Sequence, residues 1–270
     1  MIVRSSMHTH TFRCKHAIGD VEECCQAAIE GNLSYLGFSE HCPFPSDNYH
    51  FAVRDSWNNI DEYLLKIEEN KGKYPNLQIF SGLECEFYPP YDSKVFIEEL
   101  RNIYKIDYLL CGIHYPVPWV DAYNFWDREM VELPIEAIKQ YTTRLVEAIK
   151  SGFFDGIVHP DIWQWKTPVW KDEYASFARE IAKAAVDYNV PLEINCNGMR
   201  KGMINDNGVM RYPYPSAKFW EVVSEYNVKV FIGSDSHRKE HVADKIDEAL
   251  AFAEKYNLTV IPTFDRLLKK

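Results

Sequence analysis

The chain alternates short apolar runs, which are typical of buried strands, with longer amphipathic stretches, which are typical of helices. The apolar runs lie at residues 2–7, 35–41, 77–84, 107–114, 154–160, 190–198, 228–237 and, last, 258–264. The amphipathic stretches lie at residues 21–30, 57–73, 93–104, 134–151, 172–188, 216–226 and 241–256. Seven strand–helix units in this order predict an α/β fold with a parallel sheet, which the final apolar run closes or flanks.

A closed barrel and an open doubly wound sheet are both compatible with this alternation. We favour a single TIM-like barrel, because each candidate functional residue falls at, or just after, the end of its apolar run. In a parallel barrel these strand ends form one rim, whereas an open sheet would spread some of the residues along its edge. No repeat, low-complexity segment or Gly/Ser linker divides the sequence, so residues 1–270 are expected to form one domain.

Residues with metal-binding side chains share this position at strand ends. They are His8, His10, His16, His41, Glu84, His114, His159, Asp235 and His237. Neutral imidazole and carboxylate are the side chains that bind zinc, manganese and iron in proteins. In HTH and in DSH the two candidate ligands are separated by one residue, so both side chains lie on the same face of an extended strand. The sequence therefore predicts a metal centre at the rim of the barrel.

Taken one at a time, these histidines have ordinary interpretations. His16 could be a surface loop residue, and His114 could be a core histidine satisfied by the backbone. Only a shared site explains why all of them follow strand ends. Glu86 shares a strand face with one candidate ligand and is expected as a hydrogen-bond partner, whereas His50 and His241 are expected on the surface.

The net charge is −10, and no Lys/Arg cluster is long enough to track a phosphate backbone, so extended nucleic-acid binding is not expected. A small phosphorylated substrate is still compatible with this charge, because bound divalent cations can dominate the local potential. No apolar run reaches the length of a membrane span, and the start lacks a signal-peptide pattern. We therefore expect a soluble, cytoplasmic protein.

The seven cysteines form no CxxC pair and are expected to be reduced, buried apolar residues. Cys42 and Cys85 adjoin candidate metal ligands, so a softer ligand set that includes cysteine sulfur is an alternative. It is the less favoured one.

The motifs HTHT, SEH, GLE, GIHY, VHPD and GSDSH together resemble the polymerase-and-histidinol-phosphatase (PHP) superfamily over essentially the whole chain. Their order and spacing are most similar to its histidinol-phosphate phosphatase branch. The resemblance implies a distorted (β/α)7 barrel, a trinuclear metal centre and phosphoester hydrolysis. Carried over by position, it implies one metal on His8, His10, Glu84 and Asp235, a second on Glu84, His114 and His159, and a third on His16, His41 and His237.

The leading functional hypothesis is the hydrolysis of L-histidinol phosphate to L-histidinol and phosphate in histidine biosynthesis. Two or three divalent ions of zinc, manganese or iron would clamp the phosphate, and a metal-bridging hydroxide would attack it. One alternative keeps the same centre but uses a nucleotide, phosphotyrosine or many esters as substrate. Another alternative is a metal-binding module without catalysis, which the complete set of ligand positions argues against.

Residues that would bind the substrate are less clearly marked. Arg200 follows the sixth strand, where the resembling phosphatases use Arg to hold phosphate, but a surface loop Arg is an equal alternative. Arg13, Lys15 and Lys166 are further candidate cations near the rim. Asp161 could orient a ligand histidine, bind the substrate amine or protonate the leaving alkoxide. The aromatic residues that could wall a pocket for an imidazole-bearing substrate, or simply pack, are Trp163, Trp165, Phe44, Tyr115 and Trp119.

Overall fold

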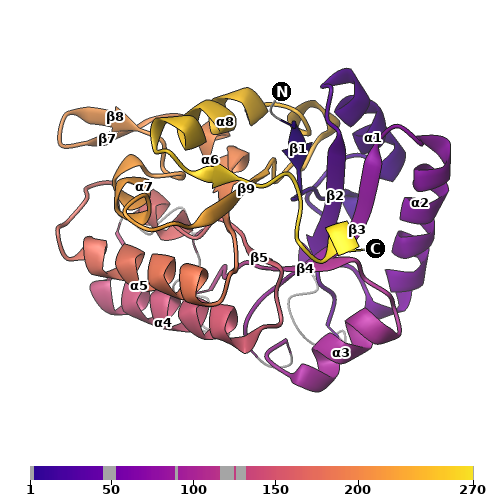
Figure 1. Cartoon of the computed structure of the whole chain (residues 1–270), viewed down its shortest axis with the longest axis horizontal. Helices are drawn as coiled ribbons and strands as arrows, with labels where there is room; N and C mark the ends of the chain where they lie inside the picture. Colours follow the sequence, from indigo (N-terminus) through magenta and orange to yellow (C-terminus); the bar gives the residue numbers. More distant parts are fainter. Residues whose placement is uncertain (1–2, 45–52, 89–90, 116–124, 126–131, 270) are drawn as a thin grey trace.

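The computed structural model describes residues 3–44, 53–88, 91–115, 125 and 132–269, and eight parallel strands form one curled sheet (Figure 1). The strand order is β1 (Ser5–Ser6), β2 (Tyr35–His41), β3 (Gln78–Cys85), β4 (Tyr108–Cys111), β5 (Gly156–Ile157), β6 (Leu192–Asn195), β9 (Lys229–Gly233) and β10 (Thr259–Val260). The segments after β1 and β9 are also joined, because Met7 N donates to Ile232 O at 3.1 Å and Asp235 N donates to His8 O at 2.7 Å. The sheet therefore curls back on itself, which is consistent with the predicted TIM-like barrel.

Helices connect the strands and cover the outside of the sheet (Figure 1). They are α1 (Val21–Glu30), α2 (Ile60–Lys73), α3 (Lys94–Asn102), α4 (Ile135–Ser151), α5 (Tyr174–Asp187), α6 (Cys196–Arg200), α7 (Ala217–Val223) and α8 (Ile246–Lys255). The start of α1 is set by a capping box, in which Asp20 and Glu23 satisfy backbone N–H groups of the first turn. The helix predicted at residues 21–30 has the same bounds as α1, and the other predicted helices differ from the observed ones mainly at their ends.

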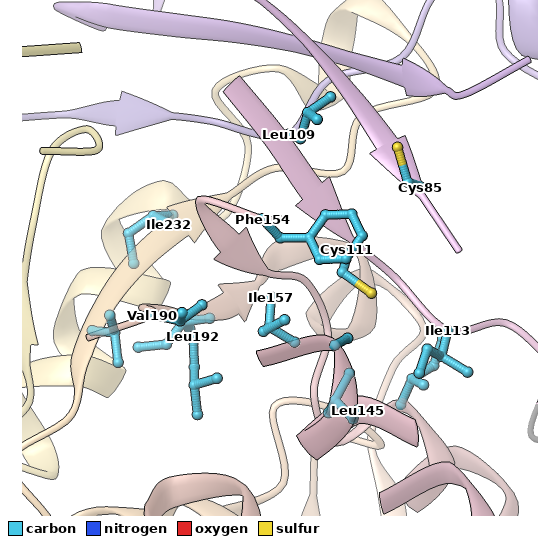
Figure 2. Packing of buried hydrophobic residues seen from close by; sticks show 14 of the residues in the cluster. Cys85, Leu109, Cys111, Ile113, Leu145, Phe154, Ile157, Val190, Leu192 and Ile232 are labelled. Carbon is cyan, nitrogen blue, oxygen red and sulfur yellow. The ribbon is translucent and has the colours of Figure 1, made fainter. Parts of the chain in front are cut away.

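Side-chain alternation along the strands separates two hydrophobic clusters, one on each face of the sheet. Leu109 and Cys111 of β4 belong to the large cluster between sheet and helices, together with Leu145 of α4 (Figure 2). Tyr108 and Leu110 of the same strand belong to the smaller cluster, which also includes Phe231 of β9, a strand distant from β4 in the sheet order. Such strands meet only inside the curl, so the smaller cluster fills its interior.

A two-stranded hairpin follows α6 and is not predicted from the sequence. Its strands are β7 (Ile204–Asp206) and β8 (Val209–Arg211), which pair antiparallel. Asn207 and Gly208 form the turn with φ of 51° and 90°. Positive φ at both central residues is the geometry that Asn-Gly favours in two-residue hairpin turns, so this dipeptide was an available signal.

The described residues include no helix that is long and apolar enough to cross a membrane. All seven cysteines are free thiols and buried. The prediction of reduced, buried cysteines is therefore confirmed.

Candidate metal centre

Glu84, at the carboxyl end of β3, lies at the centre of the predicted ligand set. Its Oε1 is 3.0 Å from His159 Nε2 and 3.4 Å from His114 Nε2. Its Oε2 is 3.0 Å from His41 Nδ1 and 3.4 Å from His8 Nε2. The side chain is buried, so imidazoles from four different strand ends surround one carboxylate that is shielded from water.

Asp235, just after β9, connects the remaining predicted ligands to this group. Its Oδ1 is 3.5 Å from His10 Nε2 and 3.5 Å from His237 Nδ1. His10 Nε2 lies 3.0 Å from His8 Nε2, and His237 Nε2 lies 2.9 Å from His16 Nε2. The structure therefore brings all of the predicted ligand residues into one contact network.

The protonation of two imidazoles in this network follows from their hydrogen bonds. His16 Nδ1 lies 2.6 Å from Cys14 O, and His237 Nδ1 lies 3.2 Å from Asp235 O. Because a carbonyl oxygen only accepts, each Nδ1 carries a proton, and in its neutral form each ring has an unprotonated Nε2. These two Nε2 lone pairs face each other at 2.9 Å and repel unless a cation lies between them. The donor set therefore fits a bound metal ion.

Electrostatics in the buried network favour the metal-binding forms of His10, His237 and the two carboxylates. Burial lowers the pKa of His10 to about 3 and that of His237 to about 3, so both rings are neutral at pH 7. Burial opposes the ionisation of Asp235 and Glu84, but the surrounding imidazoles, His8 among them, hold the pKa of both carboxyls well below the usual range. Neutral imidazole and ionised carboxylate are the forms that ligate divalent ions.

Buried carboxylates outside the predicted ligand set hold the far nitrogen of three histidines. This arrangement directs the near nitrogen, Nε2, toward a metal and raises its basicity. Only Glu86 is predicted from the sequence in this role. For Glu193 the missed signal is a carboxylate that alternates with apolar residues inside a buried strand. The pairs are Glu193 with His8 (2.7 Å), Glu86 with His114 (2.8 Å) and Glu40 with His10 (3.2 Å).

Groups of three donor atoms within 4.8 Å of one another occur repeatedly in the network. One group agrees with a metal assignment implied by the resemblance, and two others combine ligands that the resemblance places on different metals. Cys14 is not a predicted ligand, yet its buried thiol joins two of the groups. The groups are His8–His10–Glu84, His41–Glu84–His114, His10–His41–His237, Cys14–His16–His237 and His10–Cys14–Glu40.

The backbone around the network is shaped to bring these side chains close. A Cβ atom at Gly233 would lie 1.7 Å from Glu193 Oε1, so only glycine leaves room for this carboxylate. His159 and Asp235 have φ of 33° and 47°. Residues other than glycine seldom adopt positive φ, and such strain concentrates at functional sites.

A cavity of ≈ 540 Å³ adjoins the network. His8, His10 and His159 lie beneath it and are almost fully buried. The predicted ligands that line it are His16, His41, Glu84, His114, Asp235 and His237. The other lining residues are Val53, Arg54, Glu86, Tyr115, Asn197, Lys201 and His241.

The sequence predicts a surface position for His241, but in the structure this residue lines the cavity. The short helix Lys239–His241 after β9 returns the chain to the rim. Of the aromatic candidates, Tyr115 lines the cavity, whereas Phe44 is buried among core residues. Trp165 packs against the core from the side, and His50 and Trp119 lie outside the described residues.

The two arginines predicted to bind substrate do not line the cavity. Arg13 is buried and forms ion pairs with Asp20 at 2.5 Å and Glu62 at 2.8 Å. Arg200 Nη2 donates to the backbone oxygens of the loop after β9, including Asp235 O at 3.2 Å. In this structure Arg13 ties the segment that carries His16 to α2, and Arg200 ties α6 to the loop that carries Asp235.

The other predicted substrate and catalytic residues also lie outside the lining of the cavity. Asp161 accepts a hydrogen bond of 2.6 Å from the backbone N–H of Ser216, before α7, and burial raises the pKa of its carboxyl to about 7. Trp163 is buried in the core, with its ring 5.1 Å from that of Tyr174. Lys166 is buried at the end of the short helix Ile162–Lys166, and Lys15 follows the short helix Phe12–Cys14.

Comparison with known families agrees with this geometry. The model of the PHP domain family matches residues 6–197, a span that covers most of the chain. The chain belongs to the PHP domain family. Within the matched span lie the candidate ligands His8, His10, His16, His41, Glu84, His114 and His159.

Relatives of this PHP protein cover nearly its whole length. A protein of Deinococcus radiodurans named "probable histidinol-phosphatase" is 27% identical over 246 residues, which are 90% of each chain. A protein of Schizosaccharomyces pombe with the same name is 24% identical over 280 residues, covering 94% of this chain and 87% of the relative. The histidinol phosphate phosphatase of Lactococcus lactis, solved with zinc, L-histidinol and phosphate, has the same fold, with a TM-score of 0.75, 17% identity and 98% of both chains covered.

Proposed function

We propose that this PHP protein is a metal-dependent phosphatase that hydrolyses L-histidinol phosphate to L-histidinol and inorganic phosphate, as a cytoplasmic step of histidine biosynthesis. The observation that carries the proposal is the close approach of His16 Nε2 and His237 Nε2, 2.9 Å apart within a network of further candidate ligands. We also propose that residues 1–270 form one distorted (β/α)7 barrel, with β10 outside the closed ring.

The network residues would hold two or three divalent ions of zinc, manganese or iron, with Glu84 as the shared carboxylate. When bound, such ions lower the pKa of water and neutralise charge on phosphoryl oxygens. Glu84 and Asp235 supply negative charge that offsets the ions. Glu193 and Glu86 hold the Nδ1 protons of their histidines, which keeps each Nε2 free to donate its lone pair.

Histidinol phosphate is the proposed substrate because relatives whose alignments cover 90% or more of this chain bear the histidinol-phosphatase name. The phosphatase of Lactococcus lactis was solved with L-histidinol and phosphate. The cavity of ≈ 540 Å³ has the size of a site for a small phosphate ester. Tyr115 and His241 on its wall offer ring faces for an imidazole.

Steady-state kinetics of the metal-loaded protein test this proposal. We expect kcat/KM for L-histidinol phosphate to exceed that for p-nitrophenyl phosphate, nucleotide monophosphates and a phosphotyrosine peptide by about a hundredfold. A chelator should abolish all of these activities, and added metal should restore them.

Two results would contradict separate parts of the proposal. Equal kcat/KM for histidinol phosphate and p-nitrophenyl phosphate would remove the substrate assignment and leave a broad phosphatase. Full activity in protein that contains no metal would remove metal dependence. Glu180→Gln, an exposed change in α5, serves as the control for handling and folding.

A further inference from the structure

Arg54 places a guanidinium group on the wall of the cavity, although its sequence context does not mark it. The residue precedes the short helix Trp57–Asn59 and is only 3% exposed. Its Nη1 donates to Cys42 O at 2.9 Å and to the hydroxyl of Tyr91 at 3.0 Å. Its Cζ also lies 5.1 Å from the centre of the Phe44 ring. These contacts fix the orientation of the guanidinium before a ligand binds.

The opposite edge of this guanidinium has no hydrogen bond within the described part of the chain. Nε is buried without a partner, and Nη2 lies 3.9 Å from Glu86 Oε1, which is too long for a hydrogen bond. Glu86 is already engaged, because its two oxygens contact His114 Nδ1 at 2.8 Å and His114 N at 3.1 Å. Nη2 therefore keeps its donors, and the guanidinium its charge, for a group in the cavity.

Arg200, the arginine that the family resemblance suggests for phosphate, also has buried donors without a partner, Nε and Nη1, but it differs in position. It is not among the residues that line the cavity. Its Nη2 is used by the backbone oxygens of Ser234 and Asp235. Of these two arginines, Arg54 is the one that faces the space next to the candidate ligands.

We propose that Arg54 binds the phosphoryl group of the substrate through its Nη2, beside the metal-ligand network. This inference rests on the proposed phosphomonoester hydrolysis. The two N–H groups of Nη2 can donate to oxygens of a phosphate dianion, and the positive charge of the guanidinium strengthens these hydrogen bonds. The organic part of histidinol phosphate carries an ammonium group, which a guanidinium repels. The phosphoryl group is therefore the part of the substrate that Arg54 selects.

Binding of inorganic phosphate to the metal-loaded protein tests the proposal by titration calorimetry. Arg54→Gln should raise the phosphate dissociation constant about ten- to a hundredfold, because it removes a charged hydrogen-bond pair. Arg54→Lys should recover part of the affinity, since an ammonium supplies the charge but not the planar edge. Lys94→Gln removes one positive charge from an exposed side chain of α3 and should change nothing.

Metal content and thermal unfolding of each variant are measured alongside. Unchanged metal content with weaker phosphate binding supports direct contact. Phosphate affinity like that of the unaltered protein in both Arg54 variants overturns the proposal. So does metal loss in proportion to the affinity loss, which would mean that Arg54 acts through Glu86 and His114. None of these readouts uses histidinol phosphate. A wrong substrate assignment can therefore be distinguished from a wrong role for Arg54.

Discussion

A single buried carboxylate, that of Glu193, orients three neighbouring groups at once. Its Oε1 lies 2.7 Å from His8 Nδ1, while its Oε2 accepts from His159 N at 2.7 Å and from Asn195 Nδ2 at 2.8 Å. The side chain is fully buried, so water does not compete for these contacts. Two of the three partners belong to candidate metal ligands. Glu193 therefore positions two candidate ligands, His8 after β1 and His159 after β5, relative to each other.

We expect Glu193→Gln to weaken metal binding by about ten- to a hundredfold. The amide has one oxygen that accepts, whereas the carboxylate accepts at both oxygens, so one of the N–H groups now at Glu193 must lose its partner. The measurement is the metal retained per chain during dialysis against increasing chelator.

Glu180→Gln makes the same chemical change on the exposed face of α5 and should retain metal normally. Circular dichroism of both variants separates metal loss from unfolding. Identical metal retention in a folded Glu193→Gln protein would contradict the positioning role.

The candidate ligands could be predicted as a set, because they share one position at strand ends, but apart from Glu86 their partners could not. Glu84 stands out because a carboxylate in an apolar stretch needs a partner or a metal. Arg54 does not stand out, because the groups that fix it, Cys42 O and the Tyr91 hydroxyl, are 12 and 37 positions away. A contact of this kind depends on how loops meet, which local sequence pattern does not contain.

At the scale of elements, the interior of the curl depends on one large side chain of β4. Tyr108 is fully buried, and its hydroxyl donates to Met7 O and Phe38 O at 2.9 Å each. Gly82 of β3 lies against the ring, since a Cβ there would be 2.3 Å from Tyr108 Cζ. Because Gly82 has no side chain, the tyrosine ring fills the space next to β3.

Gly82→Ala should therefore lower the free energy of unfolding by about 1–3 kcal/mol, because a ring held by two hydrogen bonds cannot move aside without loss. Gly72→Ala in α2 is the matched control, since nothing lies within 4 Å of its added Cβ. It should raise stability by up to about 1 kcal/mol. Denaturant titrations of both variants measure these changes, and equal shifts would contradict the packing argument.

Helices and strands of this chain differ in how well the pattern predicts them. The long amphipathic stretch at residues 134–151 gives α4 to within one residue of its observed bounds, Ile135–Ser151. The hairpin of β7 and β8 is missed because each strand has only three residues, too few for an alternation to be recognised. The ends of apolar runs, rather than the exact strand limits, carried the information about the site.

At the scale of the whole molecule, the candidate centre exists only when distant strands are assembled. His16 and His237 contact each other although 221 positions separate them in the chain. This convergence could be predicted, because the carboxyl ends of parallel strands in a curled sheet share one rim. The cavity wall beside the centre could not, because side chains such as Arg54 and His241 reach it from loops.

Metal ions should consequently stabilise the fold of the entire chain. An ion that binds the assembled network but not the unfolded chain raises the free energy of unfolding by about 3 kcal/mol at a free concentration a hundredfold above its dissociation constant. We expect the unfolding temperature to fall on chelation and to recover when zinc or manganese is added back. Glu84→Gln should abolish most of this recovery, because Glu84 contacts histidines from four strand ends, whereas Glu180→Gln should preserve it. If the unfolding temperature did not change with metal in protein that is shown to contain it, the ions would have to bind outside this network.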